Sequence, residues 1–134
     1  MKQYTPEHAR SGLDAKLPPL GTWPNQFSDT VIRIEIPEYT SICPKTQLPD
    51  HGTMTIAYVP AKHCVELKSL KYYILGYRNL GIFYENAVNR ILKDLVAACR
   101  PVTATVTGEF NMRGGMRSVI EANYKRPRAA EKKK

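Results

Sequence analysis

The chain has 134 residues, of which 43% are hydrophobic and 24% are charged, a composition typical of one soluble globular domain. It contains no run of about 18 apolar residues, so we expect no membrane-spanning helix. Residues 1–13 lack the apolar centre of a secretory signal. We therefore expect a cytoplasmic protein that has no membrane partner.

The positive charge is concentrated at the C-terminus. The formal net charge at pH 7 is +8, and residues 125–134 hold six lysines or arginines and one glutamate. That segment accounts for +5 and leaves +3 for residues 1–124. Like charges in such a run are typical of a solvated, disordered tail. We predict a basic disordered tail over 125–134 and expect no stable nucleic-acid partner.

The three cysteines, Cys43, Cys64 and Cys99, are an odd number without short regular spacing. This is not the pattern of a secreted domain held by disulfides. A reducing compartment fits it better, which again favours the cytoplasm.

The first half of the chain predicts an irregular arm followed by two strands. Residues 1–29 are rich in proline, glycine and polar side chains. Residues 31–36 alternate charged and β-branched side chains, which predicts a strand that ends at Pro37. Residues 38–52 contain prolines and glycine and predict a loop. Residues 53–59 alternate again and predict the second strand.

The second half predicts two helices and a hairpin. Apolar side chains recur at helical spacing from 66 to 77 and from about 82 to 99, where Arg100-Pro101 ends the pattern. Residues 102–110 and 116–124 predict paired strands around a glycine-containing turn. The order β-β-α-α-β-β predicts an α+β domain over 30–124, with a four-stranded antiparallel sheet and two helices on one face.

The stretch Glu66–Tyr73 opens the first helix with one carboxylate, one hydroxyl and two ammonium groups. Lys68 and Lys71 are three residues apart, so both project from one face of a helix. Such a face can bind a polyanion, although a charged, solvated first turn explains the same residues.

Cys43 lies in the proline-containing loop, seven residues before Asp50. A nucleophilic thiol needs a group that removes its proton and a group that protonates the product, and Asp50 can serve either purpose. A buried, inert cysteine is the alternative. A metal site built from Cys43, His51, His63 and Cys64 is a further alternative, but these spacings match no standard zinc pattern, and we predict no metal.

Two further sites carry groups that can recognise a ligand. Glu85 follows Tyr84 at the start of the second helix. Its carboxylate can accept N–H bonds from a purine-like ring, or it can be present only because the helix dipole stabilises a negative charge at this end. Arg113-Gly114-Gly115 can bind a phosphate or form a plain turn. The chain has no Rossmann glycine fingerprint and no P-loop.

The chain resembles the single-domain (unimodular) NADPH-dependent nitrile reductases of the tunnelling fold, which convert 7-cyano-7-deazaguanine (preQ0) to 7-aminomethyl-7-deazaguanine (preQ1) in queuosine biosynthesis. The resemblance covers roughly residues 22–124, and Glu66–Tyr73 is its most specific part. The matching residues are Cys43-Pro44-Lys45-Thr46, Pro49-Asp50, Glu66–Tyr73, Arg78-Asn79, Gly81-Ile82-Phe83, Glu85 and Arg113-Gly114-Gly115.

This resemblance implies a role for each candidate residue. Cys43 attacks the nitrile and forms a covalent thioimide, while Asp50 donates a proton to the nitrogen. Two NADPH molecules supply the hydrides. The substrate-binding residues are Val65, Glu66, Leu67, Tyr84 and Glu85, and the residues that contact the NADPH phosphates are Lys68, Ser69, Lys71 and Arg113.

The chain departs from the family pattern at four kinds of position. Gln47-Leu48 replaces a Gly-Gln pair, His51 stands where Phe is frequent, and Tyr84 stands where many members have His. Ala87 occupies the position of a cysteine that in some members can form a disulfide with the nucleophile. We therefore expect no such redox lock.

Two other functions remain possible from the sequence. Related proteins add an amine to the same nitrile on tRNA without a nicotinamide, and the basic tail also suits a non-catalytic nucleic-acid-binding module. The retained Lys68, Lys71 and Arg113 favour the reductase. The resemblance further implies a homo-oligomer, two stacked rings of five, in which sheets join between subunits into a barrel with active sites at the interfaces.

Overall fold

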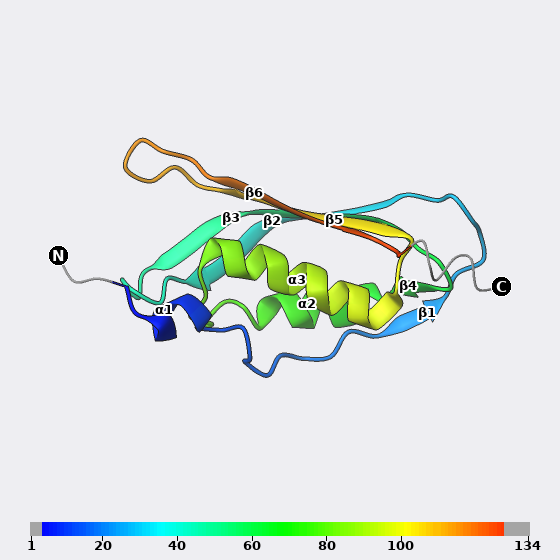
Figure 1. The fold of residues 1–134 in the computed structure, drawn as a ribbon, viewed down its shortest axis with the longest axis horizontal. Helices are drawn as coiled ribbons and strands as arrows, with labels where there is room; N and C mark the ends of the chain where they lie inside the picture. Colours follow the sequence, from blue (N-terminus) through cyan, green and yellow to red (C-terminus); the bar gives the residue numbers. More distant parts are fainter. Residues whose placement is uncertain (1–3, 128–134) are drawn as a thin grey trace.

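The computed structural model describes residues 4–127, which form a two-layer arrangement of one sheet and two main helices. Figure 1 shows both helices on the same face of the sheet, with the opposite face uncovered. The expected α+β architecture is thus confirmed. Within these residues no helix is both long and apolar enough to cross a membrane.

The sheet contains four antiparallel strands in the order β2-β3-β5-β6. Its strands are β2 Ile32–Ile42, β3 Pro49–Val59, β5 Thr103–Phe110 and β6 Val119–Lys125. Alternation places one set of side chains against the helices, and in β3 these are the fully buried Met54, Ile56 and Tyr58. The other set, rich in threonine, lies on the uncovered face.

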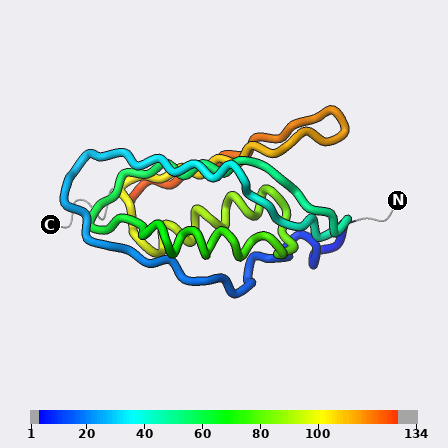
Figure 2. The backbone as a smooth tube through the Cα atoms, turned by 180° about the vertical axis from the view of Figure 1, so that it is seen from behind, coloured from blue at the N-terminus to red at the C-terminus, as the bar shows by residue number. Residues whose placement is uncertain are grey.

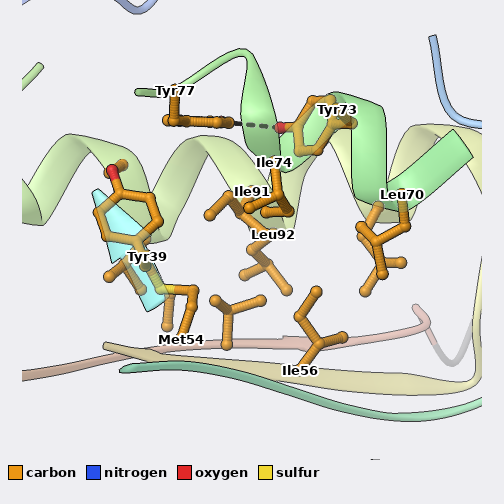
Figure 3. Packing of buried hydrophobic residues seen from close by; sticks show 14 of the residues in the cluster. Tyr39, Met54, Ile56, Leu70, Tyr73, Ile74, Tyr77, Ile91 and Leu92 are labelled. Carbon is orange, nitrogen blue, oxygen red and sulfur yellow. Dashed lines mark hydrogen bonds between the residues drawn. The ribbon is translucent and has the colours of Figure 1, made fainter. Parts of the chain in front are cut away.

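The helices are α2 Leu67–Leu75 and α3 Tyr84–Cys99, close to their predicted limits. Their apolar faces meet the sheet, as the close view of Ile91, Leu70 and Ile56 shows (Figure 3). Arg100 ends α3 in the left-handed conformation, with φ of 46°, and its N–H donates to the Val96 carbonyl. Pro101 then prevents continuation.

A polar network lies within the interface between the helices. The Tyr73 and Tyr77 hydroxyls are 2.8 Å apart (Figure 3). The Tyr73 hydroxyl also donates to the Asp94 carboxylate at 2.5 Å. Arg90 pairs with the same carboxylate at 3.2 Å. The buried hydroxyls are thereby satisfied, which is the condition for keeping them in a core.

The first two strands are longer than predicted. Pro37 does not end β2, which continues to Ile42 through a change of register between Ile36 and Tyr39. The prediction was wrong because β2 is an edge strand, and proline is tolerated at an edge or a bulge where no ladder hydrogen bond is lost. β3 likewise begins at Pro49, so the loop between the strands shrinks to residues 43–48.

The N-terminal segment is more regular than the predicted arm. It contains α1 Pro6–Arg10, with a capping box between Thr5 and His8, and β1 Thr22–Pro24, which pairs with β4 His63–Val65. Between α1 and β1 the chain runs along the helix layer on the side away from the sheet (Figure 2). These contacts link segments that are some 40 residues apart, so no local pattern signals them.

The domain also extends beyond its predicted C-terminal limit. β6 includes Lys125, and the Arg126 N–H donates to the Val102 carbonyl at 2.9 Å. The rest of the predicted tail, 128–134, lies outside the described residues.

Candidate active site

Cys43 lies at the start of the short β2–β3 loop, in a tight turn. Its N–H donates to the Leu48 carbonyl at 2.9 Å, and its carbonyl accepts from the Gln47 N–H at 2.8 Å. Gln47 adopts a positive φ of 62°, a conformation that costs energy for a residue with a side chain. The turn holds the Cys43 side chain at only 6% exposure.

The end of β2 is fastened to the segment that precedes α3. The Ile42 N–H donates to the Leu80 carbonyl, and the Ile42 carbonyl accepts from the Ile82 N–H, each at 2.9 Å. This pair of backbone bonds brings the first turn of α3, with Tyr84 and Glu85, beside Cys43.

Asp50 is the second residue of β3, and its side chain is 4% exposed. A carboxylate buried this deeply needs a partner. Arg113, in the β5–β6 connection, supplies one, with its Nη2 2.6 Å from Asp50 Oδ1. Gly114 and Gly115 both have positive φ, which lets the connection turn back.

A cavity of about 390 Å³ joins these groups. Five of the site residues predicted from the sequence line this cavity, and they come from four separate segments of the chain. Its lining consists of Tyr4, Cys43, Asp50, Phe83, Tyr84, Glu85 and Arg113. Tyr4 was not foreseen, because a lone tyrosine in a polar N-terminal segment gives no signal.

Tyr84 stacks on Phe110 with ring centroids 3.9 Å apart and an interplanar angle of 12°. Gly108 makes room for this stack, since a Cβ there would lie 2.7 Å from the Phe110 ring. Burial first, and then the nearby Asp50 charge, raise the pKa of the Tyr84 hydroxyl. The hydroxyl therefore stays protonated at neutral pH and can donate a hydrogen bond into the cavity.

The Glu66–Tyr73 stretch forms the start of α2, with Glu66 as its N-cap. The Glu66 carboxylate accepts from the Lys68 and Ser69 N–H groups, both at 2.8 Å, and these bonds lower its pKa. The Ser69 hydroxyl donates to the Glu66 carbonyl and accepts from the Gly21 N–H. Lys68 and Lys71 are exposed.

This stretch does not reach the cavity of its own chain. α2 begins beside β4, at the opposite end of the sheet from the β2–β3 loop (Figure 1). Val65 is buried there, with its N–H donating to the Tyr58 hydroxyl at 2.9 Å. The structure thus separates residues 65–71 from Cys43, Asp50 and Glu85.

The same separation keeps apart the residues of the alternative metal site that the sequence suggested. His63 and Cys64 lie in β4, at the far end from Cys43. Among the described residues, no group of three or more His, Cys, Asp or Glu side chains is arranged to hold a metal ion.

Comparison with known proteins decides the family. The family model described as "QueF-like protein" matches residues 49–129, more than half of the chain. The chain is 59% identical over 124 residues to the NADPH-dependent 7-cyano-7-deazaguanine reductase of Elusimicrobium minutum, covering 92% of this chain and 94% of that protein. The chain belongs to the QueF-like family.

Other members are similar over most of their length. The reductase of the same name from Chlorobaculum tepidum is 58% identical over 102 residues, which is 75% of this chain and 87% of that protein. A solved structure of an archaeosine synthase QueF-Like in the apo form superposes with a TM-score of 0.67 at 22% identity, over 72% of this chain and 95% of that one. At that identity the likeness shows the fold alone.

Proposed function

We propose that the chain reduces preQ0 to preQ1 with NADPH, the activity for which its family relatives are named. The observation that carries the proposal is the cavity in which a buried thiol and a buried carboxylate lie together with the Glu85 carboxylate. These groups match the reaction, because a nitrile needs a nucleophile at carbon and a proton at nitrogen.

In this proposal Cys43 Sγ bonds to the nitrile carbon while one carbon–nitrogen π bond opens. Asp50 takes the thiol proton and passes it to the nitrile nitrogen, so the step neither gains nor loses a proton. Its ion pair with Arg113 supports this sequence, since an ionised carboxylate accepts a proton before it donates one. The product of this step is the Cys43 thioimide.

Two NADPH molecules would each supply one hydride to the former nitrile carbon, and two protons from solvent would be taken up, one at nitrogen and one by the Cys43 thiolate, so that the product is the primary amine. Glu85, exposed at the start of α3, accepts N–H bonds from the deazaguanine ring. The Tyr84 hydroxyl donates to the ring or to the nitrile nitrogen. Between the two hydride transfers the carbon–sulfur bond would break, leaving an imine, and Cys43 would depart as the thiolate and regain a proton.

The residues proposed for the cofactor suit its charge. Lys68 and Lys71 expose two ammonium groups on α2, next to Ser69. Arg113 uses Nη2 for Asp50 and is 52% exposed, so its other N–H donors remain able to bind a phosphate.

We further propose that Val65–Leu67 and the two lysines complete the cavity of a neighbouring copy. Their distance from Cys43 within one chain supports this, as does the sheet, whose outer strands β2 and β6 pair on one side only among residues 4–127. Unpaired edges favour association, and two stacked rings of five with continuous sheets would close them. The mass from light scattering tests this number.

Subunit mixing tests the shared site more directly. Cys43→Ala and the Lys68→Ala/Lys71→Ala double variant should each be inactive or weak by themselves. If one site uses both chains, refolding the two together restores part of the activity. Activity that stays at the sum of the two separate variants would contradict a shared site.

The activity itself is tested by nicotinamide absorbance. We expect about two NADPH consumed per preQ1 formed, and none by Cys43→Ala. Cys64→Ala is the matched control, because Cys64 is equally buried but lies at the other end of the sheet. NADPH oxidation by Cys43→Ala at the wild-type rate would contradict the proposed mechanism.

The nicotinamide-free alternative predicts ammonia-dependent modification of preQ0-containing tRNA without NADPH turnover. The names of the relatives do not favour it. We place the reaction in the cytoplasm, where the three free thiols persist.

A further inference from the structure

Residues 4–12, the first part of the N-terminal segment, contribute Tyr4 to the wall of the cavity. Tyr4 lines it together with Cys43 and Glu85, although it is 39 residues from Cys43 in the chain. The family model begins at residue 49 and does not include this segment. Tyr4 is also not among the residues that carry the family resemblance.

Hydrophobic burial does not explain where this segment lies. α1 buries none of its residues. Three side-chain hydrogen bonds connect residues 4–12 to the rest of the described chain, and all of them lead to α3 or to the residues just before it. They are Ser11 Oγ to the Gly81 carbonyl at 2.7 Å, Asn86 Nδ2 to the Ala9 carbonyl at 2.7 Å, and Arg90 Nη1 to the Gly12 carbonyl at 2.6 Å.

Gly12 shows how closely the segment approaches. It has φ of 83°, and a Cβ there would lie 2.7 Å from the Gly81 carbonyl oxygen. Residues 9–12 are thus fixed to the element that carries Tyr84 and Glu85, so Tyr4 keeps a defined position relative to the Glu85 carboxylate.

Tyr4 connects the two sides of the cavity while leaving its ring accessible. Its centroid is 5.5 Å from that of Phe83, before α3, and the Lys45 ammonium lies 5.4 Å from it, in the Cys43 loop. The ring is nevertheless 57% exposed. An exposed aromatic ring held at a cavity rim offers a flat apolar face, which suits a planar heteroaromatic ligand.

We propose that Tyr4 is a substrate-positioning residue that packs against the deazaguanine ring, held in place by the bonds of residues 9–12 to α3. This proposal rests on the proposed function, because it names the ligand of the same cavity. It adds a chain segment to the site and requires no change in the chemistry.

The test separates KM from kcat in steady-state kinetics. Tyr4→Ala should raise the KM for preQ0 about three- to tenfold, while kcat and the KM for NADPH change by less than about twofold. Tyr4→Phe should keep the wild-type KM, since it keeps the ring. Phe27→Ala removes a ring that is 75% exposed and does not line this cavity, and serves as control.

Equilibrium binding gives a readout that does not depend on turnover. In a Cys43→Ala background, calorimetry should show preQ0 bound more weakly by about the same factor when Tyr4 is also replaced. Asn86→Ala should weaken binding in the same direction, because it releases the segment, and should add little to Tyr4→Ala.

The outcomes distinguish the two proposals. An unchanged KM and unchanged preQ0 binding in Tyr4→Ala, beside an active wild type, would overturn this inference alone. A fall in melting temperature with both KM values raised would also overturn it, because Tyr4 would then be a structural residue. A wild type that consumes no NADPH with preQ0 would overturn the proposed function.

Discussion

The Arg113 guanidinium lies 2.6 Å from the Asp50 carboxylate and so joins the β5–β6 hairpin to the second residue of β3. The Asp50 side chain is 4% exposed, whereas the Arg113 side chain is 52% exposed. A buried charge is thereby neutralised by a group that still faces solvent, which is less costly than burying both. The pair places a cation beside the proposed proton-transfer residue, in addition to its expected role at the cofactor phosphates.

Arg113→Ala should slow thioimide formation. Without the guanidinium, the buried Asp50 carboxylate loses its ion-pair partner. We expect the adduct between Cys43 and preQ0 to form more slowly than in the wild type, as measured by intact-protein mass after short incubations. Arg113→Lys keeps a cation beside Asp50 and should form the adduct at a rate between those of the wild type and Arg113→Ala. An unchanged rate would mean that the ion pair does not support proton transfer by Asp50.

Lys68→Ala with Lys71→Ala should raise the KM for NADPH about tenfold or more, because hydrogen bonds between charged groups are among the stronger polar contacts. The Cys43 adduct with preQ0 should still form. Lys93→Ala, which removes an exposed charge from α3, controls for a general change in net charge. Loss of the adduct in the double variant would show that the lysines act on preQ0 instead.

Substitution of Glu66 needs a control for its role as helix cap. Glu66→Ala removes both a cap and a possible ring contact, so it should lower the melting temperature and the affinity for preQ0 together. Glu66→Ser keeps a good N-cap and should restore the melting temperature only. If Glu66→Ser binds preQ0 like the wild type, the carboxylate serves the helix and not the substrate.

Tyr73→Phe should destabilise the fold by about 1–3 kcal/mol, because it leaves Asp94 and Tyr77 without the hydroxyl that joins them. Urea unfolding measures the change. Tyr72→Phe, at an exposed neighbouring position, should leave stability within about 0.5 kcal/mol. Equal effects of the two substitutions would contradict the importance of the buried network.

Stability should fall at alkaline pH. Burial raises the pKa of Tyr58 from 10.0 to about 12 and that of Cys99 from 9.0 to about 11. Both groups are neutral when protonated, so between the ordinary and the raised values the folded state holds protons that the unfolded state has lost. The free energy of unfolding is therefore complete below about pH 9 and decreases as pH rises toward 12.

Urea unfolding at several pH values checks this trend. Cys99→Ala should flatten the part of the decline between about pH 9 and 11, because the thiol that titrates there is gone. A free energy of unfolding that stays constant from pH 8 to 11.5 would contradict the role of these buried groups.

Local patterns in the sequence were enough to predict α2, α3 and the β5–β6 hairpin. Helical spacing of apolar side chains and the Arg100-Pro101 stop are local properties, and each acts within a few residues. The prediction that Pro37 ends a strand was wrong, and the N-terminal segment is more regular than the predicted arm. An edge strand and the β1–β4 pair depend on neighbours that are distant in the chain.

The sequence by itself determined which chemical groups the protein can bring to a site: the Cys43 thiol, the Asp50 and Glu85 carboxylates, and the cations of α2. Only the tertiary structure decided which of them meet. Backbone bonds from Ile42 to Leu80 and Ile82 set Cys43 beside Glu85, while the length of the sheet keeps Glu66 away. The chemical type of each side chain is set at its own position in the sequence, whereas the distance between two side chains depends on how the sheet and helices pack.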